Sequence, residues 1–84
     1  MAETFLLEIA TPERLFVREQ VTDTDIPAKK GYVEILPGHA AMLSELGEGE
    51  LHYTHDGQRH TLYVEGGWLE VSNAAVRVLA TRAR

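Results

Sequence analysis

Cysteine is absent from the sequence, so neither disulfide bonds nor thiolate chemistry can contribute to its stability or function. Long hydrophobic runs are also missing, because no stretch approaches the ~18 consecutive apolar residues that a transmembrane helix needs. The N-terminus has no basic leader followed by a long apolar segment, and we therefore expect no signal peptide. Basic residues are too few for a typical nucleic-acid-binding domain, since the formal net charge is −5. These absences leave a small globular domain.

The length of 84 residues predicts a single domain, spanning residues 1–84, with a core of modest size. Its charge is uneven, because residues 1–50 carry ten acidic and four basic residues whereas residues 51–84 carry three acidic and four basic. The C-terminal end contains Arg77, Arg82 and Arg84 and is locally basic. A solvated surface is the simplest interpretation of that basic end.

Short apolar stretches bounded by turn residues predict an all-β fold, a small β-sandwich or flattened barrel of about ten short strands. The first strand is expected at Phe5–Ala10 and the second at Leu15–Val21. Because side chains two residues apart share a face of a strand, Leu15, Val17 and Val21 are expected to point the same way.

A turn is predicted at Pro37-Gly38, directly after an expected strand over Tyr32–Leu36. Proline and glycine at the two central positions fit a type II turn. The following stretch, Ala40–Leu46, contains good helix formers but spans only about two turns, which is marginal for a helix.

The clearest hairpin lies in the stretch LHYTHDGQRHTLYV, where Asp56-Gly57 is the favoured two-residue turn between strands. This turn places Leu51 opposite Leu62 across the hairpin. Alternation then predicts an apolar face made of Leu51, Tyr53, Leu62 and Val64.

Gly66-Gly67 interrupts the alternation that follows this hairpin. The pair lacks the spacing of a phosphate-binding loop, so a strand kink at a sheet corner is the better interpretation. A last hairpin is expected to join Trp68–Val71 to Ala75–Ala80.

Residues able to hold a metal or perform catalysis do not form a convincing site. His55 and His60 are a diagonal cross-strand pair, but two imidazoles without a third ligand make a poor zinc site. Glu45, Glu48 and Glu50 lack the ligand spacing of a calcium loop. No serine has the context of an activated nucleophile. We expect no metal and no cofactor, and a binding or assembly module is favoured over an enzyme.

Three motifs occur together and in order: TPERLF at Thr11–Phe16, GYVEILPGHAAML at Gly31–Leu43, and YVEGGWLEVSNAAVRVLA at Tyr63–Ala80. In this order and spacing the chain resembles the N-terminal domain of the epsilon subunit of F-type ATP synthases across nearly its whole length. The resemblance implies a β-sandwich of about ten strands, in agreement with the reading of the strands above.

The resemblance also implies a role as a non-catalytic subunit of the rotating central stalk. Such a subunit binds the gamma subunit, rests on the c-subunit ring and couples ion-driven rotation to ATP synthesis. Its expected location is the cytoplasmic face of a bacterial inner membrane, where it is peripheral through the complex. It needs no small-molecule substrate of its own and no nucleic acid.

Matching positions transfer the family's interfaces to this sequence. The residues expected to contact gamma are His39, Ala40, Ala41, Met42, Ala10 and Thr11. The residues expected to face the ring are Lys30, Gly31 and Tyr32. The expected structural turns are Pro37, Gly38, Gly66 and Gly67.

The sequence departs from the family pattern at four places, one of which is Tyr32, where the family often has an acidic or other polar residue. Glu34 replaces a glycine and Ala41 replaces a proline that many members have. The chain also stops after Arg84, where the family normally continues into a helical hairpin that inhibits ATP hydrolysis. We therefore expect coupling or assembly without that mode of self-inhibition.

An alternative interpretation is a free-standing β-sandwich that binds a small molecule or carbohydrate. It requires a concave apolar pocket with a few converging polar groups. Trp68 and Tyr63 are the aromatic residues that could line such a pocket.

Overall fold

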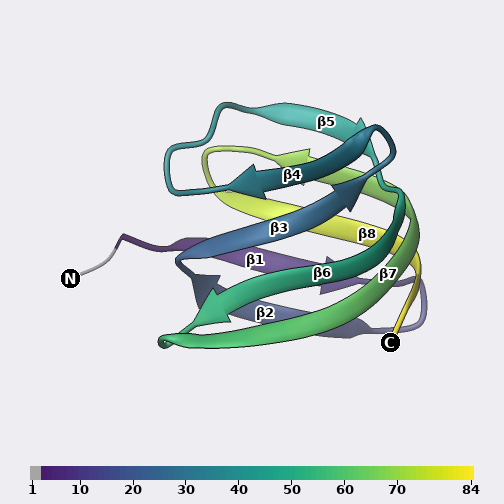
Figure 1. The fold of residues 1–84 in the computed structure, drawn as a ribbon, viewed down its shortest axis with the longest axis horizontal. Coiled ribbons are helices and arrows are strands. Elements are labelled where there is room, and N and C mark those ends of the chain that lie inside the picture. Colours follow the sequence, from purple (N-terminus) through teal and green to yellow (C-terminus); the bar gives the residue numbers. More distant parts are fainter. Residues whose placement is uncertain (1–2) are drawn as a thin grey trace.

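A computed structural model describes residues 3–84, and within this range every regular element is a β-strand (Figure 1). The all-β class is confirmed, although the strands number eight rather than about ten. No helix in residues 3–84 has the length and apolar character needed to cross a membrane. The strands are β1 Phe5–Ala10, β2 Leu15–Val21, β3 Asp23–Ala28, β4 Gly31–Ile35, β5 Met42–Glu45, β6 Glu48–His55, β7 Gln58–Val71 and β8 Ala75–Ala83.

The strands follow the order β2-β1-β8-β7-β6-β3-β4, and β5 pairs separately with β7. All pairings are antiparallel except that of β1 with β8. Strand β7 has 14 residues and belongs to both halves of the sandwich, since its first part pairs with β6 and its last part with β5. In Figure 1 its long curved ribbon starts at the hairpin with β6 and curves upward to end near β5.

One apolar core lies between the two halves of the folded sheet. Leu7, Ile9 and Val78 enter it from β1 and β8, and Ile26 and Leu51 enter it from β3 and β6, each with no exposed surface. Burial of such side chains stabilises the fold by roughly 1.5–3 kcal/mol each. The buried polar Thr24 is satisfied because its hydroxyl donates to the carbonyl of His52 at 2.8 Å.

The predicted hairpin is confirmed in its register. Strands β6 and β7 pair His55 with Gln58 and Leu51 with Leu62, which leaves Asp56 and Gly57 as the turn. Both turn residues have positive φ, 50° and 75°, as a type I′ turn requires. The predicted apolar face is also turned inward, because Leu51 and Val64 are buried and Tyr53 and Leu62 pack against the core.

The predicted kink at Gly66-Gly67 is confirmed, but it bends one continuous strand rather than ending one. Val64 and Leu69 are both buried although they are five residues apart, so the glycines reverse which alternate side chains point inward. Both glycines have positive φ, 68° and 114°. A Cβ at Gly67 would overlap the carbonyl oxygen of Leu79, and the close approach of β7 and β8 therefore depends on this glycine.

The prediction that Leu15 shares a face with Val17 and Val21 is wrong. The register of β1 and β2 shifts between Ile9 and Ala10, so that Ile9 pairs with Val17 and Ala10 pairs with Leu15. The extra residue on β2 is a β-bulge that turns Leu15 outward, where 53% of it is exposed.

The helix formers in Ala40–Leu46 do not form a helix. Residues Met42–Glu45 are strand β5, which pairs with residues 68–71 of β7. A segment this short gains too little from local propensity to resist pairing with an available strand edge.

We expect Gly67→Ala to lower the free energy of unfolding by at least about 3 kcal/mol, because strain at positive φ adds to the overlap with Leu79. Gly57→Ala is the matched control, since its φ is also positive but no atom lies within 4 Å of the new Cβ. It should cost only about 1–2 kcal/mol. Urea denaturation of both variants measures the difference, and equal losses would contradict the role assigned to Gly67.

Candidate functional site

The Pro37-Gly38 turn has the predicted type II character. The His39 amide donates to the Leu36 carbonyl at 3.1 Å, and Gly38, the third turn residue, has a φ of 85°. The His39 ring lies partly exposed, and its Nδ1–H donates to the Ala40 carbonyl at 2.7 Å. This hydrogen bond holds the ring against its own backbone.

The residues after the turn divide between the core and the surface. Ala40 and Ala41 are exposed. Met42 packs against the core, opposite Val71, and only part of its side chain is accessible. Its neighbour Leu43 points the other way and is 69% exposed, the largest exposed fraction among the bulky hydrophobic residues described. Sequence reasoning selected Met42 and missed Leu43, because the orientation of β5 depends on its pairing with β7.

The predicted ring-facing residues lie at the turn between β3 and β4. Lys30, Gly31 and Tyr32 are all exposed. The hydroxyl of Tyr32 donates to the Glu50 carbonyl at 2.8 Å, which fixes the phenol ring across β6. The ring occupies the space beside Gly49, where a Cβ would lie 2.8 Å from the Tyr32 hydroxyl.

Large apolar side chains form a row across the outer face of four strands. Trp68 on β7 pairs with Leu79 on β8, Leu79 pairs with Ala10 on β1, and Ala10 pairs with Leu15 on β2. Trp68, Leu79 and Leu15 are each more than half exposed. We call these four residues the apolar row.

Leu43 extends the apolar row at one end. It lies opposite Glu70, diagonally from Trp68, and it lines a hollow of about 330 Å³ together with Trp68 and Lys30. The row therefore joins the turn that carries Lys30 at one end and reaches Ala10, a predicted site residue, towards the other. Leu79 is the residue from which this exposed row could have been predicted. It is a large apolar residue at a position of β8 where the alternation of the strand predicts an outward, polar side chain.

Charged side chains form a second row beside the apolar row. Glu70, Arg77, Glu8 and Arg18 follow one another across β7, β8, β1 and β2. Arg77 Nε donates to Glu8 at 2.9 Å and Arg18 Nε lies 3.0 Å from the other Glu8 oxygen. The hydrogen bond from Arg77 is the main cause that lowers the pKa of Glu8, burial opposes it, and the positive charges of Arg77 and Arg18 assist it. We call these four residues the charged row.

The histidines outside the turn do not form a metal site. His55 and His60 lie with ring centroids 6.5 Å apart, and His60 stacks on Tyr53 at 5.0 Å. No group of three His, Cys, Asp or Glu residues within 3–84 is arranged to hold a metal ion. His55 instead joins the hairpin tip to β2, since its Nδ1–H donates to the Gln20 carbonyl at 2.8 Å.

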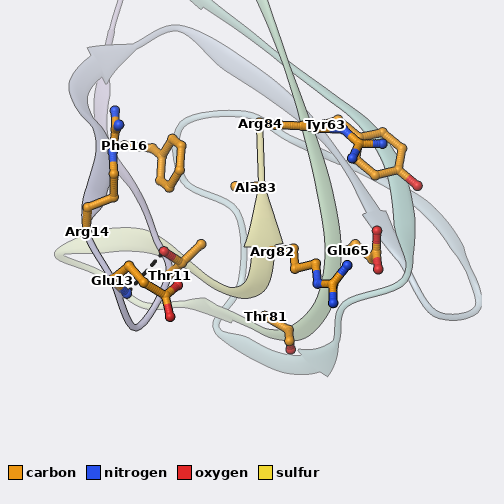
Figure 2. A pocket seen from close by; sticks show the side chains of 10 residues that line it. All are labelled: Thr11, Glu13, Arg14, Phe16, Tyr63, Glu65, Thr81, Arg82, Ala83 and Arg84. Atoms are coloured by element: carbon orange, nitrogen blue, oxygen red, sulfur yellow. Dashed lines mark hydrogen bonds between the residues drawn. The ribbon is translucent and has the colours of Figure 1, made fainter.

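Two further surface hollows are lined in part by charged side chains. One has a volume of about 240 Å³, and Figure 2 shows the side chains that line it. The guanidinium of Arg14 lies 4.2 Å from the centre of the Phe16 ring, and that of Arg84 lies 4.8 Å from the centre of the Tyr63 ring. This hollow contains Tyr63 but not Trp68, so the two aromatic residues of the alternative interpretation do not share a pocket. A third hollow, about 370 Å³, is lined by Lys29, Glu45, Leu46, Gly47, Glu48, Glu65, Gly66 and Gly67. Charged side chains lie at the rim of both hollows, and neither encloses a ligand-sized cavity lined by aromatic residues together.

We expect His55 to stabilise the fold more at pH 5.5 than at pH 8.5. Its pKa is raised mainly by the hydrogen bond to the Gln20 carbonyl, with help from Asp56 and Glu19 and against the effect of burial. A raised pKa in the folded state gives stability that is present below the usual pKa of ~6.5 and is lost as the pH rises through the folded value.

The measurement is the difference in unfolding free energy between the wild type and His55→Gln at the two pH values. An NMR titration of the His55 ring provides the control. A pKa at or below that of an unperturbed histidine, or a difference that does not change with pH, would contradict this role.

Comparison with known proteins places the chain in a family. Residues 4–84 match the family described as "ATP synthase, Delta/Epsilon chain, beta-sandwich domain". The ATP synthase epsilon chain of Solibacter usitatus (strain Ellin6076) is 52% identical over 80 residues, which cover 95% of this chain and 60% of that protein. The epsilon chain of Koribacter versatilis (strain Ellin345) is 43% identical over 83 residues, which cover 99% of this chain and 58% of that protein.

Solved structures agree on the fold. A chain of the Euglena gracilis mitochondrial ATP synthase superimposes with a TM-score of 0.88 at 20% identity, over 96% of this chain and 52% of that one. A chain from the Tetrahymena thermophila mitochondrial ATP synthase central stalk and c-ring superimposes with a TM-score of 0.80 at 13% identity, over 99% of this chain and 67% of that one. The chain thus spans about three fifths of the length of the bacterial relatives it matches. It belongs to the ATP synthase delta/epsilon chain family, in which it corresponds to the β-sandwich domain.

Proposed function

We propose that this domain is a non-catalytic part of the rotating central stalk of a bacterial F-type ATP synthase, where it binds the gamma subunit through the apolar row. Membership of the family supports the assembly, and the exposed row supports the surface. Trp68, Leu79 and Leu15 present three bulky apolar side chains on one sheet face. Large exposed apolar patches on small proteins typically mark interaction sites.

The segment His39–Ala41 extends this surface at one end. It leads directly into β5, where Leu43 is exposed, and His39 lines a small hollow of about 110 Å³ beside the turn between β7 and β8. Small side chains at Ala40 and Ala41 allow a partner backbone to approach closely. Thr11, another residue assigned to gamma, follows Ala10 at the opposite end of the row.

The turn that carries Lys30, Gly31 and Tyr32 is proposed to rest on the c-subunit ring. It is exposed and polar, and the hydrogen bond from Tyr32 to β6 holds it in one position. Because Lys30 shares a hollow with Leu43 and Trp68, the proposed ring and gamma surfaces adjoin. A rigid sandwich with adjoining surfaces for both partners can transmit torque without a catalytic site of its own. The domain would lie at the cytoplasmic face of the inner membrane through these contacts.

A free-standing ligand-binding sandwich is the less favoured function. It would need an apolar pocket that holds a ligand, whereas the exposed side chains of Trp68, Leu79 and Leu15 lie on an outer sheet face. A flat face of this kind fits a protein partner better than a small molecule.

We expect Leu79→Asp to weaken binding to the cognate gamma subunit by at least about 2 kcal/mol, because it forces a charge into the centre of an apolar interface. Thr61→Asp is the matched control, since Thr61 is exposed on the part of β7 that pairs with β6. Isothermal titration calorimetry with purified gamma measures both. Equal affinities for Leu79→Asp and the wild type would remove the apolar row from the interface.

The contribution of the turn is tested separately with His39→Asp. If His39 contacts gamma, this change should weaken binding by about 1–2 kcal/mol, as a contact near the edge of an interface would. Met42 is unsuitable for this test because it packs against the core. Wild-type affinity for His39→Asp would confine the interface to the sheet face.

A further inference from the structure

We propose that Arg18 and Arg77 of the charged row bind acidic side chains of the subunit that covers the apolar row. This inference rests on the proposed function and names the chemistry of the partner surface. The partner would present carboxylates beside an apolar stripe, and the two arginines would fix its position across β2, β1 and β8.

The first observation is that both guanidinium groups keep unused donors. Each guanidinium has five N–H groups in a planar fork. Within residues 3–84, each arginine meets Glu8 through its Nε, and the one further approach is Arg77 Nη1 to Glu70 at 3.8 Å. The side chains remain 63% and 46% exposed at Arg18 and Arg77, respectively. The Nη ends that suit a bidentate carboxylate are therefore available to a partner.

The second observation is the charge of this group. Two guanidinium groups share the single carboxylate of Glu8, and Glu70 contributes only at 3.8 Å. The four residues of the charged row carry two positive and two negative charges, so the row is neutral in a chain whose net charge is −5. An acidic partner group would therefore meet less repulsion here than over much of the rest of the surface, and the exposed guanidinium ends would attract it at short range.

The third observation is the distance between the two rows. Arg77 and Leu79 are two residues apart on β8, as are Glu8 and Ala10 on β1, so the rows lie roughly 7 Å apart. A subunit that covers the apolar row also covers the charged row. Covering it with apolar groups would leave buried guanidinium donors unpaired, which is costly. The partner must therefore supply acceptors at this position.

Glu8 separates this proposal from a purely structural role for the charged row. If the row only ties β2, β1 and β8 together, removing Glu8 or removing Arg77 breaks the ion pair between them and one further pair each, and both changes should weaken binding in the same direction. If the arginines bind acidic partner groups, Glu8 competes with them. Removing its charge would then free the arginines and leave binding unchanged or stronger.

The experiment is a titration of the cognate gamma subunit with the full chain at about 50 mM and 300 mM salt. The variants are Arg18→Gln, Arg77→Gln, the double variant and Glu8→Gln. Arg59→Gln is the matched control, because Arg59 is 45% exposed and pairs with Asp23 and Asp25 on the other side of the sandwich. Thermal unfolding of every variant shows that binding is compared between folded proteins.

We expect each single arginine variant to weaken binding about fivefold at low salt and the double variant about thirtyfold, with a smaller dependence on salt. Glu8→Gln should bind as tightly as the wild type or more tightly, and Arg59→Gln should match the wild type. Equal weakening by Glu8→Gln and Arg77→Gln, or wild-type affinity of the double variant, would overturn the arginine proposal alone. A wild-type chain that does not bind gamma would overturn the proposed function as well.

Discussion

The bend of β7 at Gly66-Gly67 is the constraint on which the rest of the structure depends. Strand β7 pairs with β6 before the bend and with β5 after it, while β8 runs along both parts. The glycines reverse the alternation, so that Val64 and Leu69 both enter the core. With a side chain at Gly67 the strand could not approach Leu79 so closely. One flexible position thus turns an eight-stranded sheet into a sandwich with a shared core.

The same reversal creates the proposed docking face. Because Leu69 points inward, its neighbour Trp68 must point outward, where it meets Leu79 across the strand pair. The bulge in β2 has the equivalent effect at the other end by turning Leu15 outward. Two irregularities in otherwise regular strands therefore align apolar side chains from distant parts of the chain.

The sequence predicted those parts of the fold that depend on local chemistry. Asp56-Gly57 specified its hairpin and register, and Pro37-Gly38 specified its turn. Both turns require positive φ, which glycine adopts readily and most other residues do not. Non-local pairing limited the rest. Strand β5 formed from helix formers because an edge of β7 was available, and that pairing decided that Met42 faces inward and Leu43 outward. The bulge that exposes Leu15 contains no glycine, so nothing in the local sequence predicts it.

The candidate surface was predictable only in part for the same reason. The resemblance to epsilon subunits pointed to His39, Ala40 and Ala10. Ala10 belongs to the apolar row, and His39 and Ala40 lie in the segment proposed to extend it. The apolar row itself combines residues 10, 15, 68 and 79, which come from four different strands and which only the strand order and register bring together. Cross-strand neighbours of this kind become visible when the register is known.

Trp68 offers the most direct test of the central claim, because it is the only tryptophan in the chain and lies in the apolar row. Incorporation of 5-fluorotryptophan into this chain gives a single ¹⁹F resonance that can be followed as unlabelled gamma is added. The account predicts a shifted resonance that a soluble paramagnetic agent no longer broadens. A complex in which the resonance keeps its position and its accessibility to that agent would contradict docking through this face.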